Sequence, residues 1–352
     1  MGLLFGQLLI YALLAAQGMG LSQALAEDPP SQAAEAPLSI ESDPEAVIPP
    51  KGLVPTSLLR LGNKQYASRF ALLADKSQRT LSVWEQQEDK LHFVSAYPMD
   101  FGRSEGDKLV SGDKKTPEGI YFFEEMLEGE SLNFDEYGKR AFTMNYPNFF
   151  DLLQGKSGSG IWLHAIPESK SLNRGSRGCL VVRNAVIDTV GKYIDLSNTP
   201  IVVQHNVTYV FPEERIQKQQ TLQSWLDRWR LSWQSQDLDS YMTFYSEKFR
   251  GNNMSKAQWR RYKKSLNEKY SSIEVKVEHP IILANDSEVF FRFLQKYKSD
   301  RLNDTGEKQL FVTGPNQQSL EILGEIWSPV KIKNDEVVAH QQSATSSTAE
   351  NL

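Results

Sequence analysis

The sequence predicts a β-rich domain followed by an α+β domain. Up to residue 210, short apolar or alternating runs are separated by turn residues, which is typical of a β-sandwich or a partly open barrel. After Pro212 the apolar residues recur with the period of a helix, and strand patterns return from residue 273. The length of 352 residues also favours two domains, since one domain usually takes about 150 residues.

Residues 1–26 have the pattern of a signal peptide. The stretch from Leu3 to Ala16 is almost entirely apolar, and Ala24-Leu25-Ala26 fits the small-x-small pattern of a cleavage site. This segment contains no Lys or Arg, so a retained N-terminal anchor is the alternative. Either way, we expect the rest of the chain to lie in the periplasm or cell envelope. No later apolar run is long enough to span a membrane.

Two segments are predicted to lack a fold of their own. Residues 27–60 are expected to form a linker, because the part from Glu27 to Pro50 contains six prolines and six acidic residues but no Lys or Arg. Such a composition buries too little apolar surface to offset the entropy lost on ordering. Residues 334–352 are polar and are predicted to be disordered.

The first domain is predicted to span residues 65–210. Its strands should follow the apolar runs, which cover residues 70–73, 80–84, 91–94, 119–123, 160–163 and 200–203. The second domain is predicted to span residues 215–332. Three helices are expected at residues 222–233, 239–249 and 256–270, followed by strands at residues 273–277, 289–294, 309–313 and 320–327. Three helices followed by a sheet make an α+β domain.

Two features of the second domain allow more than one interpretation. Trp225, Trp229 and Trp233 share one face of the first helix, and with Trp259 they either pack in the core or line a pocket. The basic run at residues 260–264 is either a solvated helix face or a contact for acidic glycan or lipid headgroups.

Composition excludes several classes of function. The net charge of −5 provides no broad basic surface for binding nucleic acid. A single cysteine excludes an intrachain disulfide framework and a cysteine-rich zinc site. Apart from His164, the histidines are scattered, and the sequence contains no dinucleotide-binding or P-loop motif. We therefore expect neither a metal nor a cofactor.

Cys179 is the strongest candidate for chemistry. In an exported protein, a lone cysteine is either buried as a small apolar residue or retained because it reacts. Its small and basic neighbours at residues 175–178 argue against a dry core position and supply backbone N–H groups that could hold an oxyanion. His164 lies fifteen positions earlier, on a predicted strand.

The sequence around Cys179 resembles the active-site motif of the L,D-transpeptidase (YkuD-type) family, in which an upstream histidine is followed by a Ser/Thr-His/Arg-Gly-Cys turn. Residues 112–121, Gly-Asp-Lys-Lys-Thr-Pro-Glu-Gly-Ile-Tyr, resemble the family's Gly-Asp…Thr-Pro-x-Gly-x-Tyr stretch. Residues 71–81 are similar to the family's first strand. The resemblance implies a sandwich-like L,D-transpeptidase catalytic domain over residues 65–210.

By this resemblance, Cys179 is the nucleophile and His164 is its general base. The carbonyl of Ala165 would orient the imidazole, and the N–H groups of Gly178 and Cys179 would form the oxyanion hole. Physical chemistry agrees with the pairing, because a thiol of pKa about 8.5 is mostly protonated at neutral pH. A histidine accepts and returns a proton in the same range.

Four further residues are candidate substrate contacts. Ser176 and Arg177 adjoin the nucleophile, and the charge of Arg177 would support the thiolate or hold a substrate carboxylate. Asn145 and Tyr146 precede a proline at a strand end, where they either point into a cleft or serve a turn. Family members often have an arginine two residues after the cysteine, where this chain has Val181, so no contact is assigned there.

The resemblance implies the peptide stem of peptidoglycan as the substrate. The thiolate would attack the carbonyl between the third stem residue and a terminal D-Ala, release D-Ala and form a thioester. An amine of a second stem would then give a cross-link, whereas water would give a tripeptide. We favour the cross-linking reaction, with L,D-carboxypeptidation and a catalytically silent envelope-binding protein as alternatives.

The order of helices and strands in residues 215–332 resembles an NTF2-like cone. Such domains follow the catalytic domain in a branch of the family that includes cell-shape-determining L,D-carboxypeptidases. The resemblance implies a role in cell shape and a surface that can recruit an envelope protein partner.

Overall fold

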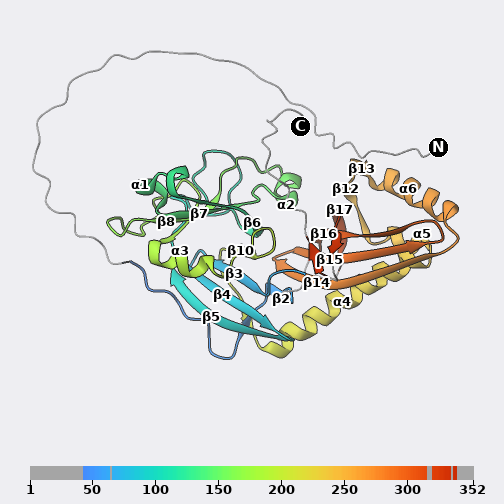
Figure 1. Cartoon of the computed structure of the whole chain (residues 1–352), viewed down its shortest axis with the longest axis horizontal. Helices are drawn as coiled ribbons and strands as arrows, with labels where there is room; N and C mark the ends of the chain where they lie inside the picture. The colour runs from blue at the N-terminus through green and yellow to red at the C-terminus, as the bar shows by residue number, and fades with distance from the viewer. Residues whose placement is uncertain (1–42, 64–65, 315–318, 334–335, 339–352) are drawn as a thin grey trace, which may run out of the picture. The chain divides into compact units, whose positions relative to one another are not determined.

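The computed structural model describes residues 43–63, 66–314, 319–333 and 336–338 (Figure 1). The predicted signal peptide at residues 1–26 lies outside these ranges, as do much of the predicted linker and most of the predicted tail. Among the helices of the described ranges, none combines the length and the apolar character needed to cross a membrane.

An eight-stranded mixed sheet forms the first domain, with the strand order β5-β4-β3-β10-β6-β7-β8-β9. Its strands are β3 (Phe70–Asp75), β4 (Thr80–Gln87), β5 (Lys90–Pro98), β6 (Gly119–Glu128), β7 (Arg140–Met144), β8 (Trp162–Ile166), β9 (Leu180–Arg183) and β10 (Pro200–Gln204). The long strand β6 pairs with β10 through its first residues and with β7 through its last ones. Residues from both parts of the sheet therefore share one apolar core, which includes Leu72, Tyr121, Phe142, Leu163 and Ile201.

Short helical segments connect the strands of the first domain. They are η1 (Gly129–Ser131), α1 (Phe134–Tyr137), α2 (Phe149–Leu153) and α3 (Asn184–Gly191). The segment α2 begins with a capping box, in which Asn148 and Asp151 bond each other's backbone N–H groups.

A seven-stranded sheet and three helices form the second domain (Figure 1). The sheet has the order β13-β12-β17-β16-β15-β14-β2. Its strands are β2 (Leu58–Arg60), β12 (Tyr245–Gly251), β13 (Met254–Ser255), β14 (Ile273–Asn285), β15 (Glu288–Ser299), β16 (Asn303–Thr313) and β17 (Glu321–Pro329). The helices are α4 (Pro212–Gln234), α5 (Leu238–Met242) and α6 (Lys256–Lys269). The predicted fold class, a β-rich domain followed by an α+β domain, is confirmed.

The second of the three predicted helices is shorter than expected. The sequence predicted a helix at residues 239–249, but α5 ends at Met242 and residues 245–251 form strand β12. The strand pairs with β17 and buries Tyr245 and Phe249 in the domain core. Sheet pairing, which a local pattern does not show, decides the conformation here.

The predicted linker at residues 27–60 is wrong at its C-terminal end. Residues 54–55 form β1, which pairs with β11 (Tyr209–Val210), and residues 58–60 form β2, which pairs with β14. Leu58 and Leu59 are completely buried on opposite faces of the sheet. The proline-rich composition ends at Pro50. Beyond it, residues 54–55 form a two-stranded sheet with β11, and residues 58–60 join the edge of the seven-stranded sheet.

The predicted disordered tail at residues 334–352 is also corrected in part. Residues 336–338 form strand β19, which pairs antiparallel with β18 (Lys331–Lys333).

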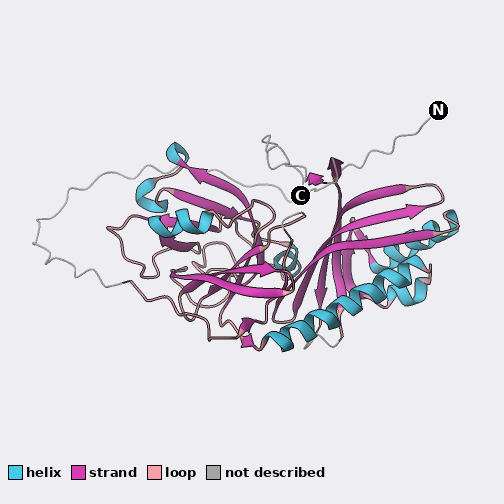
Figure 2. Ribbon diagram, turned by 60° about the horizontal axis from the view of Figure 1, so that its bottom comes forward, coloured by secondary structure: helices cyan, strands magenta, loops and turns pink. Residues whose placement is uncertain are grey.

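The two faces of the seven-stranded sheet pack against different partners. On one face, Phe291 and Phe293 belong to a core shared with α4, α5 and α6. Figure 2 shows helices of the second domain running beside its sheet. On the other face, Phe290 and Phe311 belong to a core shared with residues of the first domain, among them Phe122 and Phe150. Strands covered on both faces carry long apolar runs, as β15 does.

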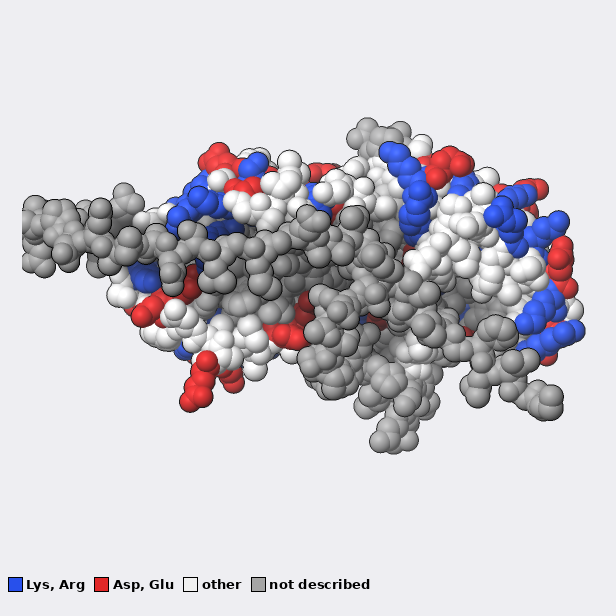
Figure 3. All heavy atoms as spheres, turned by 90° about the horizontal axis from the view of Figure 1, so that it is seen from above, with Lys and Arg blue, Asp and Glu red and all other residues white. Residues whose placement is uncertain are grey.

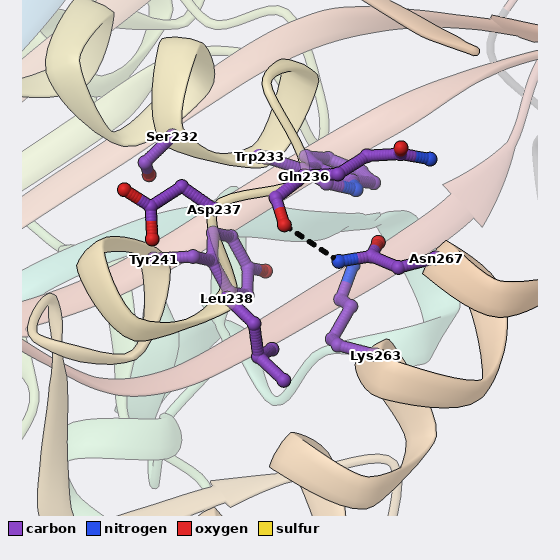
Figure 4. A pocket seen from close by; sticks show the side chains of 8 residues that line it. All are labelled: Ser232, Trp233, Gln236, Asp237, Leu238, Tyr241, Lys263 and Asn267. Atoms are coloured by element: carbon purple, nitrogen blue, oxygen red, sulfur yellow. Dashed lines mark hydrogen bonds between the residues drawn. The ribbon is translucent and has the colours of Figure 1, made fainter. Parts of the chain in front are cut away.

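The tryptophans of the second domain belong to its core. Trp225, Trp229, Trp233 and Trp259 are each at most 7% exposed and form one cluster with the sheet. Trp233 also lines a small pocket between α4, α5 and α6 (Figure 4), where the Lys263 amine lies 3.8 Å from the centre of its ring. Both interpretations of the tryptophan stripe therefore hold for Trp233.

The basic run at residues 260–264 lies on α6 and is mixed with opposite charge. Arg260 pairs with Asp239, and the Nζ atom of Lys264 lies 3.8 Å from Oε1 of Glu268. Lys263, in contrast, is buried. In the parts of Figure 3 that grey atoms do not cover, Lys and Arg side chains lie near Asp and Glu side chains. This arrangement favours the solvated helix face.

Candidate active site

Two parallel strands bring His164 and Cys179 to one region of the first domain. His164 lies on β8, and Cys179 directly precedes β9. The register pairs Leu163 with Leu180 and His164 with Val181, so Cys179 lies beside Trp162 on the neighbouring strand. Because side chains alternate along a strand, Trp162 and His164 share one face of β8 while Leu163 points into the core.

The imidazole of His164 is held by its own strand. Its Nδ1 atom lies 2.7 Å from the carbonyl oxygen of Ala165. A carbonyl only accepts hydrogen bonds, so this contact places the proton on Nδ1 and leaves Nε2 as the acceptor. His164 is 4% exposed, and this burial lowers its pKa below the ordinary value, so the imidazole is neutral at neutral pH.

The thiol of Cys179 is half-buried and protonated at rest. Its Sγ atom lies 3.6 Å from the carbonyl oxygen of Gly160. Burial raises the pKa of the thiol, while the backbone N–H of Trp162 and the charge of Arg177 act in the opposite direction. A thiol of this kind needs a base to become a nucleophile, and the neutral imidazole on the adjacent strand is a base.

Gly178 fits the turn before the nucleophile because it has no side chain. Its φ angle is +133°, and a Cβ atom there would lie 2.7 Å from the carbonyl oxygen of Lys115. Its N–H donates to Ser176 Oγ at 3.1 Å, and Ser176 Oγ donates to the carbonyl oxygen of Cys179 at 2.8 Å. This differs from the expected oxyanion role, because the Gly178 N–H already has a partner within the turn. Ser176 likewise serves the turn itself.

The Gly-Asp…Thr-Pro motif builds the loop on which this turn rests. The Asp113 carboxylate accepts from the backbone N–H groups of residues 109, 110 and 115 and pairs with the buried Lys108 at 2.8 Å. Burial alone would raise the pKa of Asp113, but these bonds together hold it well below its ordinary value. Thr116 Oγ1 accepts from the N–H of Gly102 at 2.9 Å. The loop thereby places Lys115 against Gly178.

Arg177 is exposed, and its guanidinium is bound within the chain. It pairs with Glu136 and donates to the hydroxyl of Tyr137 at 3.1 Å. Both partners belong to α1. Sequence reasoning missed Glu136 and Tyr137, because nothing in the local pattern connects residues 136–137 with a turn forty residues later.

Asn145 and Tyr146 have partners within the fold. Asn145 Oδ1 accepts from the backbone N–H of Phe122 at 2.8 Å. Tyr146 is 5% exposed, packs against Tyr121 and donates to the carbonyl oxygen of Ser157 at 3.2 Å. These contacts favour the alternative in which the two residues serve the backbone and the core rather than the substrate.

Comparisons with known proteins agree with this geometry. The family model described as the L,D-transpeptidase catalytic domain, YkuD, matches residues 69–203. The model of the Cds6 C-terminal NTF2-like domain matches residues 221–326. The structure of Bd1075 from Bdellovibrio bacteriovorus is similar with a TM-score of 0.74 and 40% identity, over 80% of this chain and 100% of that one. The chain belongs to the L,D-transpeptidase (YkuD) family, in the group with a C-terminal NTF2-like domain.

A second structural relative of this L,D-transpeptidase-family chain is a protein that determines cell shape. It is the helical cell shape determining protein Pgp2 from Campylobacter jejuni, with a TM-score of 0.60 and 25% identity over 75% of this chain and 96% of that one. A comparison with curated protein sequences gave no match. In the described part of this YkuD-family chain, no group of three His, Cys, Asp or Glu residues is arranged to hold a metal ion.

Proposed function

We propose that this protein is a cysteine acyl-transfer enzyme that acts on the peptide stems of peptidoglycan. The observation that carries the proposal is the hydrogen bond from His164 Nδ1 to Ala165, on the strand beside Cys179. It leaves Nε2 free to take the thiol proton. Sulfur then bonds to the carbonyl carbon before the terminal D-Ala, the C–N bond breaks, and His164 returns the proton to the leaving amine. A thioester at Cys179 remains.

Water is the acceptor that we propose for this thioester, which makes the enzyme an L,D-carboxypeptidase with a role in cell shape. The role in cell shape is supported by the similarity to the helical cell shape determining protein Pgp2, which covers 75% of this chain and therefore extends over both domains. Water as the acceptor is supported by the domain order, which resembles the branch of the family that includes cell-shape-determining L,D-carboxypeptidases. The sequence alone favoured cross-linking, because the catalytic motif by itself resembles that of transpeptidases.

Cross-linking is the second candidate, and the match of residues 69–203 to the L,D-transpeptidase catalytic domain supports it. Both reactions pass through the same thioester, so Cys179 and His164 do not separate them. Transpeptidation needs an acceptor amine held against the thioester with water excluded, whereas trimming needs only access for water.

The deciding experiment incubates the protein with purified tetrapeptide muropeptides and identifies the products by mass. Tripeptide as the product, even at high muropeptide concentration, supports the carboxypeptidase. A dimer joined between two third-position residues would overturn it in favour of transpeptidation. No product from well-folded protein would favour a catalytically silent binding protein.

Thioester formation has a separate test, which is the mass of the intact protein after incubation with a carbapenem. We expect one adduct on the wild type and none on Cys179→Ala.

The proposed activity also requires export, so we propose that residues 1–26 direct the chain to the cell envelope. Fractionation of cells that express the full chain tests this, and a cytoplasmic pool alone would contradict it.

A further inference from the structure

The short segment α1 lies against the strand that carries His164. Asn133 caps its start, and Gly138 ends it with a φ angle of +64°. A Cβ atom on Gly138 would lie 2.6 Å from Ala165 Cβ and 2.6 Å from Asn184 Oδ1. The chain therefore approaches β8 as closely as only glycine allows, and this approach places the preceding residue, Tyr137, over the active site.

The ring of Tyr137 packs against the rings of His164 and Trp162, which share one face of β8. It meets the imidazole of His164 edge-on, with centroids 5.1 Å apart and an interplanar angle of 80°. Its centroid is also 5.1 Å from that of Trp162. An aromatic edge in this position restricts rotation of the imidazole about its side-chain bonds and shields it from water.

Arg177 ties this segment to the turn that holds the nucleophile. Its guanidinium bonds Glu136 and the hydroxyl of Tyr137 at once, two adjacent residues of α1. Both contacts are made by the same Nη2 atom, which carries two N–H donors. Arg177 is two residues from Cys179, so one side chain connects the nucleophile turn to the residue that covers the base.

We propose that Tyr137 is a positioning residue for His164. We further propose that Arg177 holds Tyr137 in place rather than binding substrate. The proposal rests on the proposed function, in which His164 is the base. It also gives a role to the arginine of the Ser-Arg-Gly-Cys turn that does not depend on the substrate.

The pKa of His164 is the property that should change when the contact with Tyr137 is lost. Several charged groups lie around His164. Glu136 faces it from α1, Arg177 and Cys179 belong to the neighbouring turn, and Lys108 of the supporting loop acts on the thiol. Burial lowers the pKa of His164, and Tyr137 contributes to that burial. Without the ring, water reaches the imidazole, and its pKa should rise toward the ordinary value of about 6.5.

The experiment follows the titration of His164 by NMR in protein labelled on histidine, with the signal assigned through His164→Gln. Only five histidines are present. The variants are Tyr137→Leu, which keeps apolar bulk, Tyr137→Phe, which keeps the ring, and Arg177→Gln. Phe134→Ala is the matched control, because Phe134 lies on α1 but is 53% exposed. Initial rates on tetrapeptide muropeptides are measured for each.

We expect Tyr137→Leu to raise the pKa of His164 and to lower kcat about tenfold or more, since small displacements of a catalytic group are costly. Phe134→Ala should stay within about threefold of the wild type. Tyr137→Phe keeps the ring but loses the hydrogen bond from Arg177, so it should lower kcat by less than Tyr137→Leu does. Arg177→Gln should lower kcat, and it should have no further effect in the Tyr137→Leu background, because both changes remove the same contact.

Two results would overturn the proposal. The first is a Tyr137→Leu variant whose His164 titration curve and kcat equal those of the wild type. The second is an increase in KM caused by Arg177→Gln that is equal in the wild-type and Tyr137→Leu backgrounds, as expected if Arg177 binds substrate directly. Failure of the proposed function looks different. In that case the wild type yields no product from muropeptides, while the titration of His164 still responds to Tyr137→Leu.

Discussion

At the scale of single residues, the two candidate catalytic groups, the imidazole of His164 and the thiol of Cys179, are both uncharged at rest. Burial lowers the pKa of His164 and raises that of Cys179, so neither group is charged at neutral pH. The proton therefore moves from sulfur to nitrogen only as the substrate is attacked. This differs from cysteine enzymes with a preformed thiolate–imidazolium pair, in which the charges stabilise each other.

Replacing either member of the pair should abolish turnover. We expect Cys179→Ala and His164→Ala each to reduce product formation from muropeptides by at least a thousandfold, roughly the loss that follows removal of one member of a catalytic unit. Circular dichroism melts should show that both variants stay folded. A His164→Ala variant that keeps most of its activity would show that another group is the base.

The pH dependence of the reaction follows from the lowered pKa of His164. The imidazole acts as a base only when it is neutral, so the rate should fall as the pH drops through its pKa. Because burial lowers that pKa, the acid limb of kcat/KM should lie below about 6.5, the ordinary value for histidine. Rates on muropeptides measured across this range test the sign, and an acid limb above that value would contradict it.

Gly178 allows a prediction with a close control. Gly178→Ala would place a Cβ atom 2.7 Å from the carbonyl oxygen of Lys115, whereas Gly155 has a φ angle of +71° and open space around its Cα. Gly155→Ala should therefore cost only the backbone strain, about 1–2 kcal/mol. Gly178→Ala should cost more and also displace Cys179, which lowers the rate of carbapenem acylation. Equal losses of unfolding free energy in the two variants would contradict this.

His164 and Cys179 could be identified from the sequence as the candidate pair because the motif contains both. Tyr137 and Glu136 could not, since their part in the site depends on the contact between α1 and β8. The same holds for the partner of the Gly178 N–H. Ser176 was expected to face the substrate, but its hydroxyl bonds within the turn.

At the scale of elements, α2 of the first domain contacts the second domain at Gly324, where the absence of a side chain leaves room for the Phe149 ring. Phe149 of α2 packs against Phe311, and a Cβ atom on Gly324 would lie 2.0 Å from the Phe149 ring. From the same segment, Asp151 pairs with Lys156 at 3.0 Å, and Lys156 also pairs with Asp107 of the active-site loop at 2.7 Å. The second domain thus contacts a segment that supports the loop under Gly178.

This contact predicts a non-additive pair of substitutions. Gly324→Ala should destabilise the chain because it displaces the Phe149 ring from its site against Phe311. In a Phe149→Ala background the ring is absent, so Gly324→Ala should cost much less. The free energies of unfolding of the two single variants and the double variant test this. Simple additivity would show that the ring and Gly324 do not share one site.

Two of the element boundaries that failed on sequence evidence depend on pairing between distant segments. Residues 58–60 looked like the end of a linker, but they are a strand because β14 pairs with them. Residues 245–251 looked helical, but they pair with β17. By contrast, the helix predicted at residues 222–233 lies within α4, since its apolar stripe is a local pattern.

At the scale of the whole molecule, the second domain is built from two separate stretches of the chain. β2 precedes the first domain in sequence but belongs to the sheet of the second. Arg292 of the second domain pairs with Glu307 at 2.9 Å and donates to the carbonyl oxygen of Ser197 of the first domain at 2.6 Å. Cutting the chain near residue 211 would therefore leave the second domain without an edge strand, and both domains with exposed apolar surface.

The shared core predicts one unfolding transition instead of two. Domains that bury this much apolar surface against each other should lose their structure together, because the exposed face would destabilise whichever remained. Tyrosine and tryptophan fluorescence, far-UV circular dichroism and carbapenem acylation at Cys179 should give coincident denaturant midpoints. Phe311→Ala, which opens the core between the domains, should move all three to lower denaturant together, by about 3–5 kcal/mol in free energy. If acylation persisted beyond the loss of tryptophan signal, which arises mainly from the second domain, the first domain would fold without its partner.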